Sequence, residues 1–234
     1  MTADADSSPH GRLERALASL RGLAVGDALG SQFFVPVNHP LLKRRELPPG
    51  LWQWTDDTEM ACSIVSVLAA HQRIDQDELA RSFAHHHDFD RGYGPAVNRL
   101  LRLIREGGDW RELASALFDG QGSWGNGAAM RIAPLGAWYA DDPEQATHQA
   151  EISAYPTHQH REAVVGAMAV AAAAALAAGP AGPPSAEDLL DDVIALLPRS
   201  AVTAGAAPGA GHAGLRRRHD RRRRAGLRAA YERP

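Results

Sequence analysis

The sequence contains only one cysteine and one lysine, and it lacks a long hydrophobic run. With Cys62 alone, the chain cannot form an internal disulfide or a cysteine zinc cluster, so a cytoplasmic location is the default expectation. We expect Cys62 itself to be a small core residue on a helix. The most apolar stretch, residues 163–178, is mostly alanine and is too short and weakly hydrophobic to span a bilayer. No secretory signal is recognised either. These absences predict a soluble protein with no membrane partner.

Positive charge is concentrated at one end of the chain. Residues 201–234 contain nine arginines against Asp220 and Glu232, a net charge of about +7. Because the whole chain carries −3, residues 1–200 carry about −10. An acidic body does not attract nucleic acid, so binding of that kind would have to come from the tail alone. Lys43 is the single lysine, and this preference for arginine, with abundant alanine and glycine, indicates a GC-rich coding sequence.

Helical periodicity runs through most of the chain. With 234 residues, 44% of them hydrophobic, the chain is long enough for one domain with a substantial core. The first eleven residues are polar and are expected to be disordered, and leucines at helical spacing then predict a first helix up to Gly26. Further helices are predicted over residues 60–71, 75–87, 95–106, 109–118, 130–139, 143–154, 161–178 and 185–197. No segment has the pattern of a strand, so the predicted fold class is all-α.

Loops and helix starts add detail to this prediction. The segment between Gly30 and Trp54 contains four prolines, so it cannot be regular helix and is expected to be a long surface loop. The alanine-rich helix 161–178 has little side-chain bulk, which lets neighbouring helices approach closely and predicts a central position. Three helices have a recognisable N-cap, with an acidic residue three positions on: Asp75 with Glu78, Asp109 with Glu112, and Ser185 with Asp188.

The run Thr55-Asp56-Asp57 precedes an apolar helix and is the strongest candidate for a site. Hydroxyl and carboxylate oxygens are the ligands that a hard divalent cation needs. Two neighbouring aspartates repel each other, so their burial calls for a compensating charge. The same residues are also good helix caps, because negative charge in the first turn suits the helix dipole. The run alone leaves both interpretations open.

Asp27 lies in the small-residue segment Gly22–Gly30, where an apolar setting leaves its carboxylate in need of a partner. We consider a structural hydrogen-bond acceptor the better interpretation of Asp27 than a catalytic group.

A glycine-rich turn, residues 122–131, leads into the helix predicted from residue 130. Backbone N–H groups of such a turn and the positive end of a helix can meet a phosphate or diphosphate. Trp124 could stack on a base, and Arg131, expected just inside the helix, adds a fixed cation. A glycine loop on its own is weak support, since Gly125-Asn126-Gly127 also makes an ordinary turn.

His158 follows in a polar loop between two helices. His158 and His160 do not have the spacing that places two zinc ligands on one helical face, so we expect a ligand contact at His158 and no zinc site. A lone loop histidine is usually only solvated, so the other motifs must carry this assignment.

Taken in order, four motifs closely resemble those of the ADP-ribosylglycohydrolase family. They are Gly26-Asp27-Ala28-Leu29-Gly30, Thr55-Asp56-Asp57-Thr58, Gly125-Asn126-Gly127 with Met130-Arg131, and Thr157-His158 with His160. Their order and spacing are more specific than any single match, and the similarity covers roughly residues 12–200. The resemblance implies a compact orthogonal bundle of helices with a binuclear magnesium site. It also implies hydrolysis of the glycosidic bond of ADP-ribose conjugates, on proteins or on small molecules.

The resemblance also implies roles for individual residues. Thr55, Asp56 and Asp57 resemble one half of the magnesium site, with Asp56 and Asp57 also in the catalytic set. Gly125, Asn126, Gly127 and Arg131 resemble the loop that cradles the diphosphate and distal ribose, Trp124 the aromatic residue that stacks on adenine, and His158 a ligand-contacting residue. Cleavage would pass through an oxocarbenium-like ribosyl centre, as in other glycoside hydrolysis.

Two departures from the family pattern stand out. Many members carry a glutamate a few residues after the Gly-Asp motif, where this chain has Phe34, and Asp90 is then the remaining candidate for an acid. The family supplies further metal ligands from a C-terminal Asp-x-Asp-Thr motif, which is missing from this sequence. The second half of the binuclear site is therefore expected to be incomplete.

The tail, residues 201–234, is rich in arginine and loses helical periodicity from His212. We expect it to be disordered or frame-shifted, because a GC-rich coding choice for it can be read one base over as an ordinary globular segment. A frame change near residues 200–212 would explain the missing motif. The alternative is a basic arm for nucleic acid, which we consider the weaker interpretation.

The sequence therefore predicts a magnesium-dependent hydrolase of ADP-ribose conjugates, with the activity of this form reduced by the missing ligands. The alternative is a non-catalytic module that binds ADP-ribose or a nucleotide without holding two metals. The pattern of residues does not fix the oligomeric state.

Overall fold

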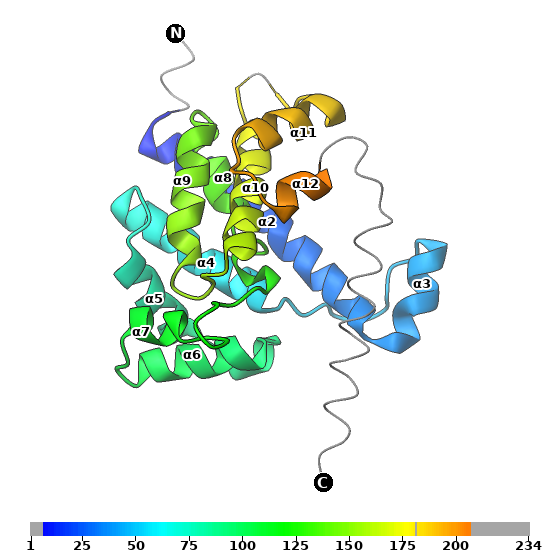
Figure 1. Cartoon of the computed structure of the whole chain (residues 1–234). Coiled ribbons are helices and arrows are strands. Elements are labelled where there is room, and N and C mark those ends of the chain that lie inside the picture. The colour runs from blue at the N-terminus through cyan, green and yellow to red at the C-terminus, as the bar shows by residue number, and fades with distance from the viewer. Residues whose placement is uncertain (1–6, 181, 207–234) are drawn as a thin grey trace.

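Helices form the framework of the structure from residue 9 onward (Figure 1). The computed structural model describes residues 7–180 and 182–206, and these ranges contain no β-strand, which confirms the all-α class. No helix in the same ranges is long and apolar enough to cross a membrane. The α-helices are, in chain order, α2 (Pro9–Ser31), α3 (His39–Arg44), α4 (Asp56–His71), α5 (Gln76–His86), α6 (Pro95–Arg105), α7 (Trp110–Ser115), α8 (Ala133–Trp138), α9 (Pro143–Ala154), α10 (Arg161–Ala177), α11 (Ala186–Ala195) and α12 (Ala201–Ala206).

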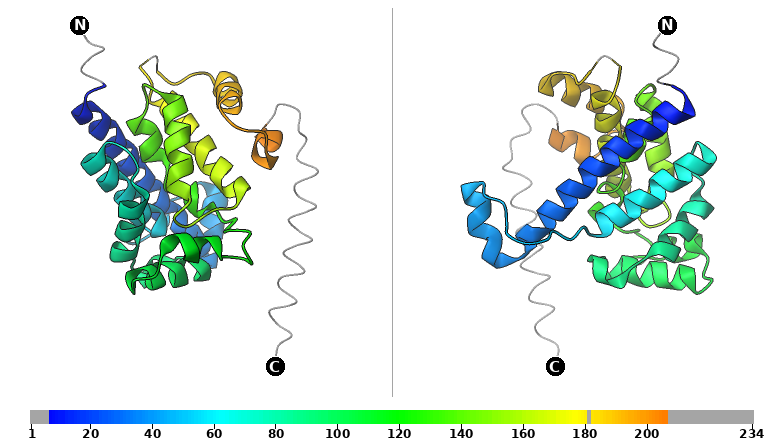
Figure 2. Two further views of the ribbon diagram at one scale, coloured as in Figure 1. Left: turned by 60° about the vertical axis from the view of Figure 1, so that its left-hand side comes forward. Right: turned by 180° about the vertical axis from the view of Figure 1, so that it is seen from behind.

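Four short 3-10 turns lie between these helices. They are η1 (Gln32–Phe34), η2 (Pro36–Asn38), η3 (Phe89–Arg91) and η4 (Asn126–Ala128). In the view from behind, α2 crosses the back of the bundle next to α4, and α3 projects beyond the C-terminal end of α2 (Figure 2).

The alanine-rich helix α10 is central, as predicted. It packs against α8, α9 and α11, and its small side chains let these neighbours come close. Gly136 of α8 is the tightest point, because a Cβ built there would collide with the carbonyl oxygen of Ala171 on α10. The core around this contact includes Trp138, Leu135 and Ile132, all fully buried.

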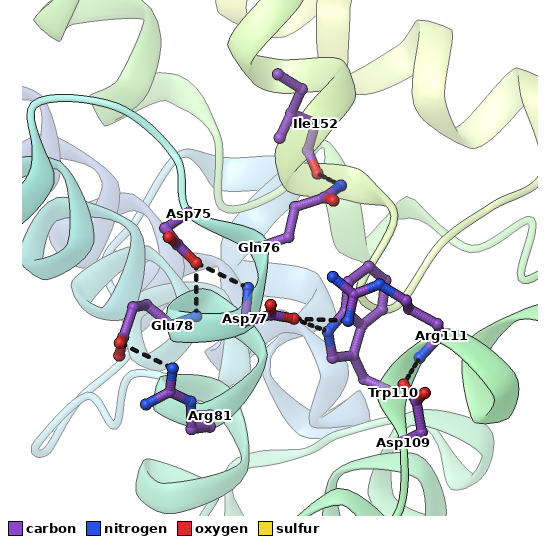
Figure 3. A network of polar contacts seen from close by, with 9 residues as sticks. All are labelled: Asp75, Gln76, Asp77, Glu78, Arg81, Asp109, Trp110, Arg111 and Ile152. Atoms are coloured by element: carbon purple, nitrogen blue, oxygen red, sulfur yellow. Dashed lines mark hydrogen bonds and ion pairs between the residues drawn. The ribbon is translucent and has the colours of Figure 1, made fainter.

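The predicted N-caps are present. Asp75 accepts hydrogen bonds from the backbone N–H groups of Asp77 and Glu78, at 3.0 and 3.1 Å (Figure 3). Asp109 and Ser185 cap α7 and α11 in the same way. The cap of α5 is also a junction, because Asp77 accepts from Trp110 Nε1 at 2.7 Å and Gln76 donates to the carbonyl oxygen of Ile152 (Figure 3). These bonds tie α5 to α7 and α9.

The ends of the folded region differ from the sequence prediction. Ser8 accepts a hydrogen bond from Gly11 N and Pro9 occupies the first turn of α2, so residues 9–11 are helical rather than disordered. Residues 201–206 form α12, so the irregular tail expected from 201 does not begin there. Residues 1–6 and 207–234, and with them the expected frame-shifted segment, lie outside the described residues.

Residues 32–54 are less irregular than expected, and part of their surface is apolar. Pro36 begins η2 and Pro40 is the second residue of α3, since a proline fits the first turn of a helix, whereas Pro48 and Pro49 lie outside the helices. This segment also exposes several large apolar side chains, among them Phe34, Val37, Leu47 and Leu51. Cys62 was wrongly predicted as a core residue: it lies on α4 but on its exposed face.

Candidate functional site

Thr55 caps helix α4 and places two carboxylates in its first turn. The Thr55 hydroxyl accepts from the backbone N–H of Asp57 at 3.4 Å, and α4 begins at Asp56. The capping interpretation of this run is therefore right for Thr55. A cap and a cation ligand are compatible roles, because the Thr55 hydroxyl oxygen has two lone pairs and uses one of them for Asp57 N.

Asp27 holds this helix start in place. Its carboxylate accepts hydrogen bonds from the backbone N–H and the hydroxyl of Thr55, at 2.7 and 2.6 Å. It accepts two more from Thr58, of which the hydroxyl bond is 2.6 Å long. Asp27 is thus a structural hydrogen-bond acceptor, as preferred from the sequence, and it fixes the start of α4 against α2.

The environment of Asp56 and Asp57, in the first turn of α4, disfavours their charged forms. Burial, and then the neighbouring Asp57, raise the pKa of Asp56 to about 6. Burial and the charge of Asp27 also raise the pKa of Asp57. Both carboxylates would be stabilised by a cation, which is the property expected of metal ligands before the metal binds.

One hollow brings three of the sequence motifs together. We call it the glycine-loop hollow; its volume is about 250 Å³. Its walls include Asp56, all of Gly125-Asn126-Gly127, and His158, together with Met60, Met130, Phe118, Ser123 and residues 94–97. Because whole small ligands generally occupy larger pockets, this hollow suits one part of a ligand, such as a ribose or a base.

The ring of His158 lies directly under the glycine loop. A Cβ built on Gly127 would sit 2.5 Å from His158 Cε1, and one built on Gly125 would sit 3.3 Å from Nε2. The two loops meet again at Gly122, where a Cβ would lie 2.6 Å from the backbone nitrogen of His160. The glycines are therefore required by the close approach of the histidine loop.

His158 is nearly inaccessible, with 2% of its surface exposed. Its Nδ1 lies 2.8 Å from the Thr157 hydroxyl, and its backbone N–H donates to the carbonyl oxygen of Ala154 at 2.8 Å. Burial, and then the positive charge of Arg131, lower the pKa of His158 to about 3. The imidazole is therefore neutral at physiological pH and can exchange hydrogen bonds with an uncharged ligand group.

Arg131 occupies a different place from the one predicted. It lies two residues before α8 rather than inside a helix, because α8 begins only at Ala133. Its side chain is fully buried: Nη2 donates to the carbonyl oxygen of Ser153 at 3.0 Å, and the guanidinium lies over the Phe83 ring at 4.5 Å. Arg131 does not line the glycine-loop hollow, so the expected direct approach to a diphosphate is not what the fold provides.

Trp124 projects from the glycine loop with 58% of its surface exposed. Its ring stacks on that of His160, with centroids 5.3 Å apart. Trp124 is thus next to the glycine-loop hollow but is not part of its lining.

Asp90 lies in a second hollow, on the other side of the loop that covers Asp56. This Thr55 hollow, of about 480 Å³, is lined by Thr55, Asp90, Phe34 and Gly92, together with Ser31, Gln53, Trp54, Asp88 and Arg91. A Cβ on Gly92 would lie 3.8 Å from Asp56 Oδ1, so Gly92 lies next to that carboxylate. Asp57 lines neither hollow.

Glu59 anchors the loop between the two hollows. Its Oε1 accepts from Asp88 N at 3.0 Å and from the Tyr93 hydroxyl at 2.7 Å. Arg91 adds an ion pair with Asp88 at 3.2 Å and stacks over the Trp54 ring at 3.5 Å. The position of residues 88–94 over Asp56 is therefore fixed from both ends.

The oxygen donors present fit one side of a cation site. Thr55, Asp56 and Asp57 supply a hydroxyl and two carboxylates from adjacent positions, which matches the preference of magnesium for oxygen. Across residues 7–180 and 182–206, no group of three or more histidine, cysteine, aspartate or glutamate side chains is arranged to hold a metal by itself.

Two features of the site were missed from the sequence. Phe118 lines the glycine-loop hollow, with 57% of its surface exposed and a positive φ of 54°. The following Asp119-Gly120 was an available turn signal, since such pairs mark a change of chain direction. The clamp of Glu59 on Tyr93 had no signal, because its two ends are far apart in the sequence.

The comparison with protein families agrees with these motifs. The sequence model described as ADP-ribosylglycohydrolase matches residues 8–232. The chain belongs to the ADP-ribosylglycohydrolase family. Members of this family are hydrolases of ADP-ribose conjugates and are generally metal-dependent, and the helical fold is consistent with the family fold.

Relatives of the family extend the comparison. The ADP-ribosylhydrolase ARH3 of Bos taurus is 32% identical over 180 residues, covering 68% of this chain and 49% of its own length. The protein of the same name from Danio rerio is 33% identical over 136 residues, covering 53% and 37%. The uncharacterized protein YegU of Escherichia coli K12 is 30% identical over 182 residues, covering 68% and 53%. The matches to the Bos taurus and Escherichia coli proteins thus cover about two thirds of this chain. They span about half the length of those relatives.

Proposed function

We propose that this chain is a magnesium-dependent hydrolase that cleaves the glycosidic bond of ADP-ribose conjugates, on a protein or on a small molecule. The observation that carries this proposal is the convergence of Asp56, the Gly125–Gly127 loop and His158 on one hollow. These residues are separated by up to 102 positions in the sequence, and a chance approach of all three motifs is improbable. We further propose a cytoplasmic location.

The two hollows suggest how a ligand would lie. The glycine-loop hollow, lined by Asn126, His158 and Phe118, takes one ribose of the ligand, while Trp124 projects beside it to stack on adenine. The Thr55 hollow takes the end that carries the scissile bond, since Asp90 lies there. Thr55 and Asp56 are neighbours in the chain and line one hollow each, so the cation that they bind would lie between the two parts of the ligand.

The proposed reaction is a hydrolysis at the anomeric carbon of the distal ribose. Oxygen from water forms the new bond to this carbon, the glycosidic bond breaks, and its electron pair and one proton go to the leaving atom. The products are ADP-ribose and the unmodified acceptor. Bound magnesium would supply charge neutralisation and orient the attacking water.

Residues of this chain have separate roles in this proposal. Asp56 and Asp57 hold the cation together with Thr55, and Asp27 orients Thr55 through two hydrogen bonds. Asp90 is the candidate that delivers the proton to the leaving atom, because Phe34 occupies the place of the family glutamate.

A second candidate function is a module that binds ADP-ribose without turnover. It is favoured by the small number of available cation ligands. Thr55, Asp56 and Asp57 lie at the start of α4, and Asp27 is already engaged by hydrogen bonds from Thr55 and Thr58. The described residues contain no group of three or more histidine, cysteine, aspartate or glutamate side chains placed to hold a metal. In this form the glycine loop and His158 would bind the ligand without metal.

Calorimetry with ADP-ribose, with and without Mg²⁺, combined with release of ADP-ribose from a modified protein, tests both functions. Binding that strengthens with Mg²⁺ and is accompanied by release supports the hydrolase. Binding that is independent of Mg²⁺, without release, supports the module. Absence of binding under both conditions contradicts both proposals. Glu14→Ala on the exposed face of α2 is the matched control for Asp56→Ala, which should remove the effect of Mg²⁺.

A further inference from the structure

Arg131 carries a positive charge into the interior of the protein without a carboxylate partner. No ion pair to Arg131 occurs among the described residues, and its Nε has no hydrogen-bond partner there. Burial lowers its pKa to about 9, which still leaves the guanidinium charged at neutral pH. A buried charge with no carboxylate at ion-pair distance is destabilising, although the charge of Asp56 favours it from further away, so its retention at this position needs a reason.

The contacts of Arg131 place it behind the glycine-loop hollow. Nη1 lies 3.4 Å from Met60 Sδ, and Met60 is one helical turn after Asp56 and lines the hollow. The guanidinium is thus separated from the hollow by the side chain of Met60.

Arg131 also stands at the end of the helix that leads to His158. Its Nη2 donates to the carbonyl oxygen of Ser153, in the last turn of α9, where a cation is favoured by the helix dipole. The next carbonyl, of Ala154, accepts from the backbone N–H of His158 at 2.8 Å. Arg131 and His158 are therefore fixed by adjacent carbonyl groups of one helix end.

We propose that Arg131 is a positioning residue that keeps the imidazole of His158 uncharged under the glycine loop. A fixed cation in an interior of low polarity disfavours a second cation nearby, and its effect is not weakened by solvent. Because Nδ1 already pairs with the Thr157 hydroxyl, a neutral His158 can present Nε2 to a sugar hydroxyl as the one remaining donor or acceptor, set by the tautomer, whereas a charged ring could only donate.

Other titratable groups near His158 must be considered together with Arg131. Asp56 on α4 lines the same hollow and would favour a charged imidazole, and His160 belongs to the same loop. The glycine loop, residues 122–127, has no titratable side chain. Two effects lower the pKa of His158: its burial, which is the larger, and the positive charge of Arg131.

The test is a titration of His158 by nuclear magnetic resonance on the full chain labelled with ¹⁵N-histidine. The chain has 11 histidines, and the signal that disappears in His158→Asn identifies the ring. Arg131→Gln keeps an N–H group for the Ser153 carbonyl but removes the charge, and Arg131→Lys keeps the charge. Arg21→Met, which removes an exposed arginine of α2, is the matched control.

In Arg131→Gln we expect the pKa of His158 to rise by about one or more, so that its titration begins at a higher pH than in the wild type. Arg131→Lys and Arg21→Met should leave the onset near the wild-type pH. If Arg131→Gln does not keep the native fold, Arg131→Met is the second variant, since an apolar chain of similar volume often replaces a buried ion without loss of stability. An unchanged titration of His158 in the uncharged variants would reduce Arg131 to a cap of α9 and overturn the proposal.

This inference rests on the proposed function, in which the glycine-loop hollow binds the ligand, but its test needs no ligand. A chain that fails to bind ADP-ribose and still shows the shift in His158 contradicts the proposed function alone. A chain that binds ADP-ribose and shows no shift contradicts the role of Arg131 alone.

Discussion

The imidazole of His158 and the α-carbon of Gly127 are so close that no side chain fits between them. A Cβ on residue 127 would lie 2.5 Å from Cε1 and 2.8 Å from Nε2. The ring cannot easily retreat, because it is buried and its Nδ1 is 2.8 Å from the Thr157 hydroxyl. The glycine motif and the histidine motif are therefore one structural unit.

Gly127→Ala should break this unit. The added methyl group must displace either the ring or the loop, and we expect a loss of about 1–3 kcal/mol in the free energy of unfolding together with at least tenfold weaker binding of ADP-ribose. Thermal denaturation and calorimetry measure the two effects. Gly22→Ala is the control, because a Cβ there meets no atom within 4 Å and alanine should stabilise α2 by roughly 0.5–1 kcal/mol. Equal behaviour of the two variants would contradict the close contact.

Thr58→Val should destabilise the start of α4. The variant loses the 2.6 Å hydrogen bond to Asp27 and leaves part of a partly buried carboxylate without a donor, at about 1–3 kcal/mol. Thr58→Ser keeps the hydroxyl and should lie close to the wild type. Urea denaturation of the three proteins checks this prediction, and a Thr58→Val variant as stable as Thr58→Ser would show that the bond contributes little.

Asp56→Asn should stabilise the protein in the absence of divalent cations. The pKa of Asp56 is raised from 3.8 to about 6, so the native state binds the proton more tightly than the unfolded state. The contribution of Asp56 to stability is therefore present below pH 3.8 and is lost as the pH rises to about 6. Above this pH the carboxylate is charged in the native state, which is unfavourable. The wild type should thus lose stability relative to Asp56→Asn between about pH 4 and pH 6.

Added Mg²⁺ should reverse this order. The cation would stabilise the wild type through Asp56 and Asp57 but not Asp56→Asn, and melting curves with Mg²⁺ or with a chelator at pH 7.5 would detect the difference. Glu14→Gln, on the exposed face of α2, should respond to Mg²⁺ as the wild type does. A Mg²⁺ response that persists in Asp56→Asn would remove Asp56 from the cation site.

His158 should contribute to loss of stability in acid. Its pKa is lowered from 6.5 to about 3, so the unfolded state takes up a proton at a higher pH than the native state does. The stability contributed by neutral His158 is fully present above pH 6.5 and is lost as the pH falls from there towards 3. The difference in unfolding free energy between the wild type and His158→Asn should shrink across this window. A constant difference between pH 7 and pH 4.5 would contradict the buried, neutral state.

Local sequence patterns predicted the helices and their caps because those features depend on residues within one or two turns. Asp75 with Glu78 and the alanine run of α10 are of this kind. The grouping of Asp56, Gly127 and His158 was not accessible to periodicity, and it was suggested by the order of the motifs alone. Arg131 was misplaced because a glycine-rich turn followed by an apolar run resembles the start of a helix, whereas the 3-10 turn η4 delays α8 to Ala133. The assignments of ligand and cation roles stay predictions.

The glycine-loop hollow also has a consequence for folding. Its walls come from α4, from the loop before α8 and from the chain after α9, so it exists only when helices formed by distant parts of the sequence have docked. Contacts between such distant residues form late, because closing long loops is slow. Binding of a nucleotide probe to this hollow should therefore appear after helical circular dichroism during refolding, and it would report the last stage of assembly rather than the first.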